Sequence, residues 1–360
     1  MKYKYWFASL EGISSGTKKR LLELFGNEEE IYRMPEYEWE QIDIIPERTK
    51  EQLIAGKKDC SWEASYEEFQ KQKIRLICWN SPEYPEKLKN IYDAPYCLYV
   101  KGNLPPKDRK LAAVVGARNC SPYGQAVAKN IGKQLAMRGI GIISGLAYGI
   151  DAAAHVGAIE GKGAAYGILG CGIDICYPAA NRKLYQQVEA CGGILSEYGM
   201  GCQPQRHMFP QRNRIISGLS DVVIVVEAKK RSGSLITADR ALEQGKTVYA
   251  VPGRITDSLS YGCNWLLSQG ATPFYSIEEF LKDMEILNGE NLLHKNLIEF
   301  SLEKNERLVY SVLDFNPQNL ETIMEKTCLS LMDATAALFG LMESGVVKEV
   351  YRNYFVKNSL

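Results

Sequence analysis

Long apolar runs, histidines and paired cysteines are scarce in this sequence. No apolar stretch approaches the ~18 residues of a membrane-spanning helix, there are three histidines, and none of the ten cysteines belongs to a C-x-x-C pair. These shortages argue against a membrane protein, a His-based metal centre, a zinc site and a disulfide scaffold. The opening residues, MKYKYWFASLEG, are too short and too aromatic for a signal peptide. We therefore expect a cytoplasmic protein with free thiols, no metal, no cofactor and no membrane contact.

The common nucleotide-binding and catalytic motifs are missing as well. G-x-G-x-x-G does not follow the first strand of the central region, and the Walker pattern is absent, so neither a dinucleotide site nor a P-loop ATPase is supported. No nucleophile stands at a recognisable spacing from a base. We interpret Asp151 as a helix N-terminal cap and His155 as a buried, hydrogen-bonded histidine. The sequence therefore predicts a protein that is not an enzyme.

Charge is balanced overall but divided unevenly along the chain. The whole sequence has 43 Lys+Arg and 43 Asp+Glu. Residues 110–275 carry 17 basic and 10 acidic residues, and the remainder carries 26 basic and 33 acidic residues. The middle of the chain is therefore the part suited to a polyanion.

The first part of the chain, residues 1–73, is predicted to be a small helical domain. Spaced apolar residues indicate short amphipathic helices, which are interrupted at Gly26, Pro35 and Pro46. The stretch Gly12–Gly16, GISSG, has two interpretations. It can be a helix-hairpin-helix turn whose backbone N–H groups hold a phosphate, or a plain connection in a helical packing domain.

Residues 74–284 alternate between strand and helix patterns. Predicted strands are 74–79, 111–116, 139–144, 164–169, 193–196, 222–226, 247–251 and 271–275. Val222–Val226 is an apolar β-branched run, which is typical of a strand buried on both faces of a parallel sheet. Residues 81–106 are interpreted as a connector interrupted by prolines. This alternation predicts an α/β fold, a Rossmann-like parallel sheet with helices on both faces.

The C-terminal part consists of a polar linker, 285–303, and a compact domain, 304–360. Three predicted helices followed by a hairpin are typical of a winged helix. A DNA-reading version needs basic or amide side chains on the second helix of its helix-turn-helix, which is the last of the three predicted helices. The sequence of this helix, SLMDATAALFGLMES, has none and carries Asp333 and Glu343. Packing or partner binding is therefore favoured over DNA reading.

Four loops follow predicted strands and lead into helices. In a parallel sheet such loops gather beyond the carboxyl ends of the strands, where ligands bind. Glycines allow a close approach of phosphate, and helix N-termini add N–H donors. The loops are 116–118 (GAR), 144–149 (SGLAYG), 177–182 (YPAANR) and 229–234 (KKRSGS). Each alone is equally well explained as a tight turn, but together they indicate a ligand that bears phosphate.

A basic loop, which is expected to face solvent, precedes Val222–Val226. Arg206, Arg212 and Arg214 lie within nine residues that contain no acid, and the planar guanidinium suits phosphate. The alternative is a solvated charged loop with a structural ion pair. Aromatic residues, on which bases can stack, lie beside these segments: Tyr123, Tyr148, Tyr177 and Phe209.

Six stretches of the central region resemble, in order, the motifs of the DNA-processing protein A family, also called Smf. They are VVGARNCSPYG, ISGLAYGIDAAAH, GCGIDICYPAANR, FPQRNRIISGLSDVVIVVEA, SGSLITADRALEQGKTVYAVPG and YGCNWLLSQGA. The resemblance implies a homodimer that binds incoming single-stranded DNA in natural transformation (competence). It also implies loading of a RecA-type recombinase onto that DNA during recombination, with no catalytic reaction.

The resemblance places DNA contacts on eight residues: Gly116, Arg118, Arg212, Arg214, Arg231, Ser232, Gly233 and Ser234. The loops selected above add Ala117, Gly145, Asn181 and Lys230, and the basic loop before Val222–Val226 adds Asn213. The alternative function is a nucleotide phosphoribohydrolase of the same Rossmann-type superfamily, with Glu227 or Asp151 as its carboxylate.

Overall fold

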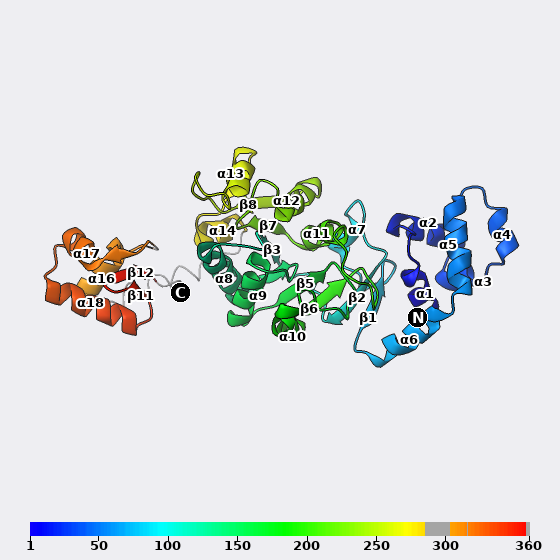
Figure 1. Cartoon of the computed structure of the whole chain (residues 1–360), viewed down its shortest axis with the longest axis horizontal. Helices are drawn as coiled ribbons and strands as arrows, with labels where there is room; N and C mark the ends of the chain where they lie inside the picture. The colour runs from blue at the N-terminus through cyan, green and yellow to red at the C-terminus, as the bar shows by residue number, and fades with distance from the viewer. Residues whose placement is uncertain (285–302, 315, 358–360) are drawn as a thin grey trace. The chain divides into compact units, whose positions relative to one another are not determined.

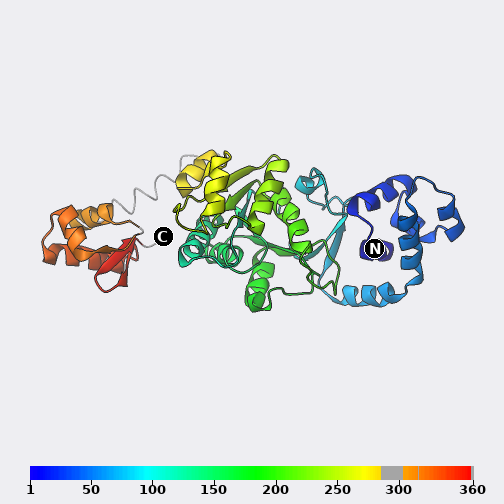
Figure 2. The ribbon, with the colours of Figure 1, turned by 45° about the horizontal axis from the view of Figure 1, so that its top comes forward.

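The chain forms two compact units, Met1–Tyr275 and Ser276–Leu360 (Figures 1 and 2). This computed structural model describes residues 1–284, 303–314 and 316–357. The predicted linker, 285–303, lies outside the described residues except for Glu303. The predicted domain boundaries at 73 and 284 stay predictions.

Six helices begin the first unit and form what we term the helical module. They are α1 (Lys2–Ser9), α2 (Ser15–Phe25), α3 (Glu28–Arg33), α4 (Glu36–Glu40), α5 (Glu47–Lys58) and α6 (Ser61–Lys71). Their shared core contains the fully buried side chains of Trp6, Trp39 and Leu53. The α2 helix begins after Ser14, whose hydroxyl accepts a hydrogen bond from the backbone N–H of Thr17, an N-cap that satisfies one free donor of the first turn.

The rest of the first unit is a nine-stranded sheet with helices on both faces. Its elements are β1 (Arg75–Cys78), α7 (Glu86–Lys89), β2 (Cys97–Gly102), β3 (Leu111–Val115), α8 (Pro122–Met137), β4 (Gly141–Ser144), α9 (Ile150–Glu160), β5 (Ala165–Leu169), η1 (Ala179–Asn181), α10 (Arg182–Cys191), β6 (Gly193–Ser196), α11 (Met208–Leu219), β7 (Val222–Val225), α12 (Gly233–Glu243), β8 (Thr247–Ala250), α13 (Tyr261–Ser268) and β9 (Thr272–Pro273). One layer holds α8, α9 and α10, and the other holds α7, α11 and α12 (Figure 1).

The strand order is β1-β2-β6-β5-β4-β3-β7-β8-β9. From β3 the chain steps outward through β4 and β5 to β6, then crosses back to place β7 beside β3. The pairs from β6 to β9 are parallel, so the predicted α/β class with a mostly parallel sheet is confirmed. The β3–β7 junction is the point where the direction of winding reverses, which is where ligands bind in open α/β sheets.

The prediction for residues 81–106 is wrong, because this segment contains the strand β2. The β2 strand pairs antiparallel with both β1 and β6, so one edge of the sheet departs from the parallel pattern. The apolar and aromatic residues Cys97–Val100 are buried. They are the strand signal that the surrounding prolines obscured.

The second unit contains α14 (Ile277–Asp283), α16 (Lys304–Val312), β10 (Gln318–Asn319), α17 (Leu320–Thr327), α18 (Leu331–Glu343), β11 (Val347–Tyr351) and β12 (Tyr354–Lys357). Its three strands form a small antiparallel sheet in the order β10-β12-β11. Val309, Ile323, Leu341 and Phe355 pack in its core. The winged-helix assignment stays a prediction. Within the described part of the chain, every helix is too short or too polar to cross a membrane.

Candidate nucleic-acid interface

The loops after β3 and β7 are joined at the β3–β7 junction by their backbones. Ala117 N–H donates to the carbonyl of Glu227 at 2.8 Å. A Cβ at Gly116 would lie 2.6 Å from Cγ1 of Ile150 and 3.0 Å from the Glu227 carbonyl oxygen, closer than real Cβ contacts. Gly116 is therefore required by packing between loops. This packing accounts for Gly116 and for the buried Ala117 without any ligand.

Arg118 faces solvent at this junction. Its guanidinium carbon lies 5.2 Å from the centroid of the Phe209 ring, and that ring lies 5.5 Å from the ring of Tyr177. Tyr177 is exposed and Phe209 is half-buried. Among the described residues, Arg118 has no ion pair to a carboxylate. An exposed cation above one aromatic ring, with a second ring beside the first, offers a phosphate contact next to a stacking surface.

The loop after β7 carries a second exposed basic group, Lys229–Arg231. Lys230 Nζ lies 5.7 Å from the ring centroid of Tyr261, at the start of α13. Ser232 caps α12, because its hydroxyl accepts from Ser234 N–H at 3.4 Å. Gly233 is exposed with open space around it. Lys230, Arg231 and Gly233 are therefore accessible, whereas Ser234 is buried.

Arg212 does not lie on a solvent-facing loop, so that expectation is wrong. It lies within α11 and is 4% exposed. Its Nη1 donates to the carbonyl of Gly145 at 3.0 Å and to the carbonyl of Ile168. Asp151 lies close by and accepts from Gly145 N–H at 3.0 Å. Burial raises the pKa of Asp151, and the Arg212 charge opposes that rise. Arg212 therefore ties together the ends of β4 and β5.

Arg214, also in α11, is engaged in a structural ion pair. Its Nη2 contacts both carboxylate oxygens of Glu197 at 2.8 Å, and its Nε donates to the carbonyl of Asp93 at 2.7 Å. The side chains of Arg214 and Glu197 are 9% and 17% exposed. The expectation of a solvent-facing loop is wrong for Arg214 as well, and the alternative of a structural ion pair holds for it.

The two remaining amide side chains of the predicted set also bond to backbone. Asn181 Nδ2 donates to the carbonyls of Leu146 at 2.9 Å and Ala147 at 3.3 Å. Asn213 Nδ2 donates to the carbonyl of Gly233 at 3.2 Å. Both side chains hold neighbouring loops in place. Their predicted DNA contacts, like those of Arg212 and Arg214, stay predictions.

Glu227 occupies the N-terminus of α8. Its carboxylate accepts from Ser121 N–H at 2.9 Å and from Ser121 Oγ at 2.5 Å. A Cβ at Gly124 would lie 2.3 Å from the carboxylate carbon, so glycine makes room for it. The N-cap residue and the positive end of this helix therefore already serve an internal anion. Glu227 is 3% exposed.

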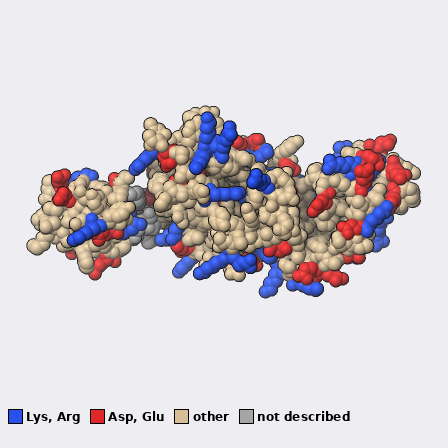
Figure 3. All heavy atoms as spheres, in the orientation of Figure 1, with Lys and Arg blue, Asp and Glu red and all other residues tan. Residues whose placement is uncertain are grey.

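A fifth loop, between β8 and α13, also follows a parallel strand and leads into a helix, but it is not among the four predicted loops. Ala228 N–H donates to Leu259 O, and Gly262 N–H donates to Ala228 O, both at 2.7 Å. This loop therefore adjoins Lys229–Arg231 and adds the exposed Arg254. On the face drawn in Figure 3, Lys and Arg side chains gather over α12 and α13, whereas acidic side chains are frequent on the helical module.

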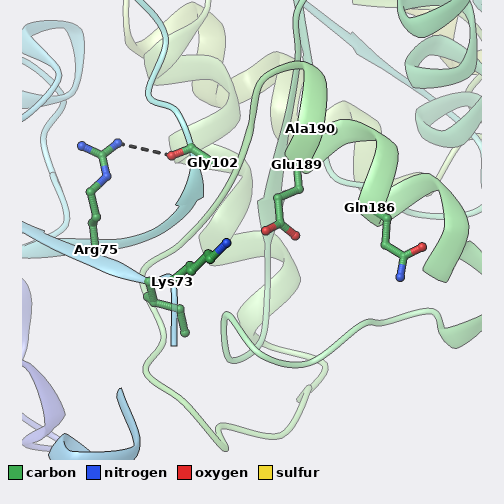
Figure 4. Close-up of a pocket in the computed structure, with 7 residues that line it drawn as sticks. Lys73, Arg75, Gly102, Gln186, Glu189 and Ala190 are labelled. Carbon is green, nitrogen blue, oxygen red and sulfur yellow. Dashed lines mark hydrogen bonds between the residues drawn. The ribbon is translucent and has the colours of Figure 1, made fainter. Parts of the chain in front are cut away.

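A separate shallow groove of about 680 Å³ lies between β1 and α10 (Figure 4). Lys73, Arg75 and Glu189 line it, and Arg75 donates to the carbonyl of Gly102 at 3.4 Å. Gly102 pairs with the first residue of β6, so the groove lies at the opposite edge of the sheet from the loops described above. Its charges are mixed, and it is not part of the candidate interface.

Comparison with known proteins identifies relatives across the central region. Residues 75–285 match the family described as DNA recombination-mediator protein A. DNA processing protein DprA of Streptococcus pneumoniae is 47% identical over 202 residues, covering 56% of this chain and 71% of the relative. Protein Smf of Synechocystis is 29% identical, and the alignment covers 96% of each chain.

Solved structures give the same relationship. The X-ray structure of DprA from Streptococcus pneumoniae superposes with a TM-score of 0.67 at 36% identity, covering 78% of this chain and 97% of that one. DNA processing protein A of Helicobacter pylori, described with a single-stranded DNA binding mode, superposes with a TM-score of 0.54 at 30% identity, covering 59% and 95%. The chain therefore belongs to the DNA-processing protein A (DprA/Smf) family.

Proposed function

We propose that this chain binds single-stranded DNA through the carboxyl edge of its central sheet and acts as a recombination mediator. One observation carries the proposal. Exposed cations, Arg118 and Lys229–Arg231, lie beside exposed or half-buried aromatic rings at the β3–β7 junction. Cations that follow a sugar–phosphate backbone, with rings on which bases stack, are the features of sequence-tolerant single-strand binding.

The contacts inside the site favour a DNA strand that lies across the loops. They argue against a mononucleotide held deep between the loops. The Glu227 carboxylate occupies the N-terminus of α8, the kind of position at which phosphates bind in other proteins. The Arg212 guanidinium already donates to backbone carbonyls. The accessible cations are those at the surface. We therefore assign the phosphate contacts to Arg118, Lys230 and Arg231, and a positioning role to Arg212, Arg214, Asn181 and Asn213.

The test is fluorescence anisotropy with an oligothymidine and a duplex of equal length, each over a salt series. We expect tighter binding of the single strand, little dependence on sequence, and a log affinity that falls with log salt by roughly 0.7 per contacted phosphate. Equal affinity for single strand and duplex at matched salt would contradict the proposal.

A nucleotide phosphoribohydrolase is the alternative activity, and the geometry does not favour it. Such an enzyme needs an accessible carboxylate beside its substrate. Glu227 is held by Ser121 and buried, and Asp151 is buried near Arg212. We therefore propose that the chain is not an enzyme of this kind. Release of free base from nucleoside monophosphates by the purified protein would reverse this assignment.

We also propose that the protein works in the cytoplasm as a homodimer during natural transformation. It would protect incoming single strands there and load a RecA-type recombinase onto them. Two linked basic faces gain avidity without new contacts, because the second binding step is intramolecular. Light scattering of the full chain at tens of micromolar tests the dimer. Recombinase assembly on DNA coated with a single-strand-binding protein, with and without this protein, tests loading.

We interpret the second unit as a winged helix that packs or binds a partner. Its helix α18 carries Asp333 in the first turn and no basic side chain. A helix inserted into the major groove needs donors for base edges and phosphates. We therefore expect no contribution from α18 to DNA affinity.

A further inference from the structure

We propose that Glu197 is a positioning residue that couples the helical module to the strand-binding edge through α11. This inference rests on the proposed single-strand binding. It concerns how the site is held, since Glu197 contacts Arg214 and Ser15.

The first link is the ion pair between α11 and the residue after β6. Arg214 Nη2 lies 2.8 Å from both carboxylate oxygens of Glu197. Arg214 also donates to the carbonyls of Asp93 at 2.7 Å and Gln211 at 2.9 Å, and its Nε lies 3.2 Å from the carboxylate of Asp93, which is exposed and therefore the weaker partner. A pair that is largely shielded from water is screened little by salt. Loss of one partner leaves the other charge poorly solvated. The position of α11 therefore depends on Glu197.

The second link joins Glu197 to the helical module. Ser15, the first residue of α2, donates its hydroxyl hydrogen to Glu197 Oε1 at 3.0 Å, and the same hydroxyl accepts from Tyr96 N–H at 3.1 Å. One turn further on, Lys19 Nζ donates to the carbonyl of Ala94 at 2.7 Å. The beginning of α2, where a helix-hairpin-helix turn would hold DNA, is therefore docked on the sheet domain.

The third link runs along α11 to the strand site. Arg212 and Arg214 are two residues apart, so about 200° of helix rotation separates them and they project to opposite sides. Arg212 donates hydrogen bonds to the carbonyls of Gly145 and Ile168. In the first turn of α11, the ring of Phe209 lies beneath Arg118. One helix is thus held on one side through Glu197, which also accepts from Ser15 of the helical module, and on the other side by its contacts with the strand-binding loops.

This coupling predicts that loss of the Glu197 charge changes DNA affinity in the direction opposite to the one that charge alone predicts. Glu197 follows β6, so it lies at the same edge of the sheet as the candidate interface. Removing a negative charge near a polyanion should strengthen binding if charge alone matters. If Glu197 positions α11, the same change should weaken binding.

The experiment uses the full chain with Glu197→Gln, Ser15→Ala and the double variant, and measures oligothymidine affinity by anisotropy. We expect E197Q to weaken binding by about fivefold or more with an unchanged salt slope, because no phosphate contact is removed. S15A should weaken binding in the same direction and by less. The double variant should be no weaker than E197Q, because Ser15 acts through Glu197 and effects within one network do not add.

Glu243→Gln is the matched control. It makes the same change in charge at an exposed pair with Arg240 on α12, and affinity should stay the same or rise. Unchanged or tighter binding by E197Q would overturn the coupling, as would a lower melting temperature with unchanged affinity. If E197Q does not fold, S15A carries the same test.

A readout that does not use DNA separates this inference from the proposed function. Hydrogen exchange of the backbone amides of 208–214 should be faster in S15A than in the wild type, and unchanged in E243Q. If the wild type fails to bind single strands, the proposed function fails, and this exchange difference still decides whether the module and α11 are coupled. Equal exchange in S15A and wild type would overturn the coupling.

Discussion

At the scale of single residues, the arginines of the central region divide by burial. The guanidinium of Arg118 lies at the surface over the ring of Phe209. The guanidinium of Arg212 is buried below the loops and donates to two carbonyls. A guanidinium can donate to phosphates and also to peptide carbonyls, since all five of its N–H groups are donors. Location therefore decides which of the two partners each arginine can reach.

Replacing Arg118 should affect binding and leave stability unchanged. Arg118→Ala is expected to lower single-strand affinity about tenfold, because a charge-assisted hydrogen bond to phosphate contributes roughly 1.5–3 kcal/mol. Arg118→Lys should recover part of the loss, since it keeps the charge without the fork. Anisotropy and thermal melting on the same samples check this. A drop in melting temperature with unchanged affinity would contradict the assignment.

Replacing Arg212 should act mainly on the stability of the protein. Arg212→Ala removes the donor of two buried carbonyls and the counter-charge of Asp151. We expect the free energy of unfolding to fall by about 3 kcal/mol, measured by urea denaturation. The exposed Arg240→Ala should change it by less than about 1 kcal/mol. An Arg212→Ala protein of wild-type stability would show that these buried contacts contribute little.

His155 should make stability depend on pH. Burial, the largest cause, and then the nearby Arg212 charge lower the pKa of His155 to about 3. Between that value and the unfolded pKa of about 6.5, the unfolded chain binds a proton that the folded chain does not. Stability should therefore decrease as pH falls below about 6.5, by at most about 1.4 kcal/mol per pH unit.

The measurement compares urea unfolding of wild type and His155→Gln at pH 7.5, 6.5 and 5.5. The raised pKa of Asp151 acts in the opposite sense at lower pH, so the difference between the two proteins isolates His155. We expect H155Q to show the weaker decline. Parallel pH profiles would mean that His155 becomes protonated in the folded protein as readily as in the unfolded chain.

At the scale of elements, the start of α8 is built around an internal carboxylate. Ser121 caps the helix and at the same time donates to Glu227, which comes from the loop after β7. An anion at a helix N-terminus is favourable. The same contact joins the two loops at the β3–β7 junction, where Arg118 and Lys230 are presented.

Gly124→Ala should destabilise the protein although alanine is the better helix former. Helix propensity alone favours alanine by about 1 kcal/mol. The added methyl group would overlap the Glu227 carboxylate, and such overpacking costs about 1–3 kcal/mol. Gly233→Ala, at the first residue of α12 with open space around it, is the control and should keep or raise the melting temperature. A G124A protein more stable than wild type would contradict the packing argument.

At the scale of the whole molecule, DNA affinity should reside in the first unit. The exposed cations and rings of the candidate interface all belong to it, and α18 of the second unit has an acidic first turn. Removing 303–360 should therefore leave single-strand affinity within about threefold, a difference of under ~0.7 kcal/mol. Anisotropy on the shortened chain, after circular dichroism has shown that it is folded, measures this. A hundredfold loss would move the DNA site to the second unit.

Local sequence patterns determined the class of the fold and selected the edge that carries the candidate interface. Alternating strand and helix signals predicted the α/β class, since periodicity depends on near neighbours. The rule that parallel strands present their carboxyl ends at one edge selected the loops at 116–118 and 229–234, which the structure joins through Glu227. The ordered motifs of 114–271 identified the family, which the match over residues 75–285 confirms.

Only the tertiary structure decided which polar side chains face solvent. The partners of Arg212 lie 67 and 44 residues away, at Gly145 and Ile168. Glu227 reaches Ser121 across 106 residues. No local pattern encodes such contacts, because burial follows from how strands and helices pack after they form. Three arginines within nine residues therefore indicated an anionic ligand, while two of the three, Arg212 and Arg214, hold the protein itself together.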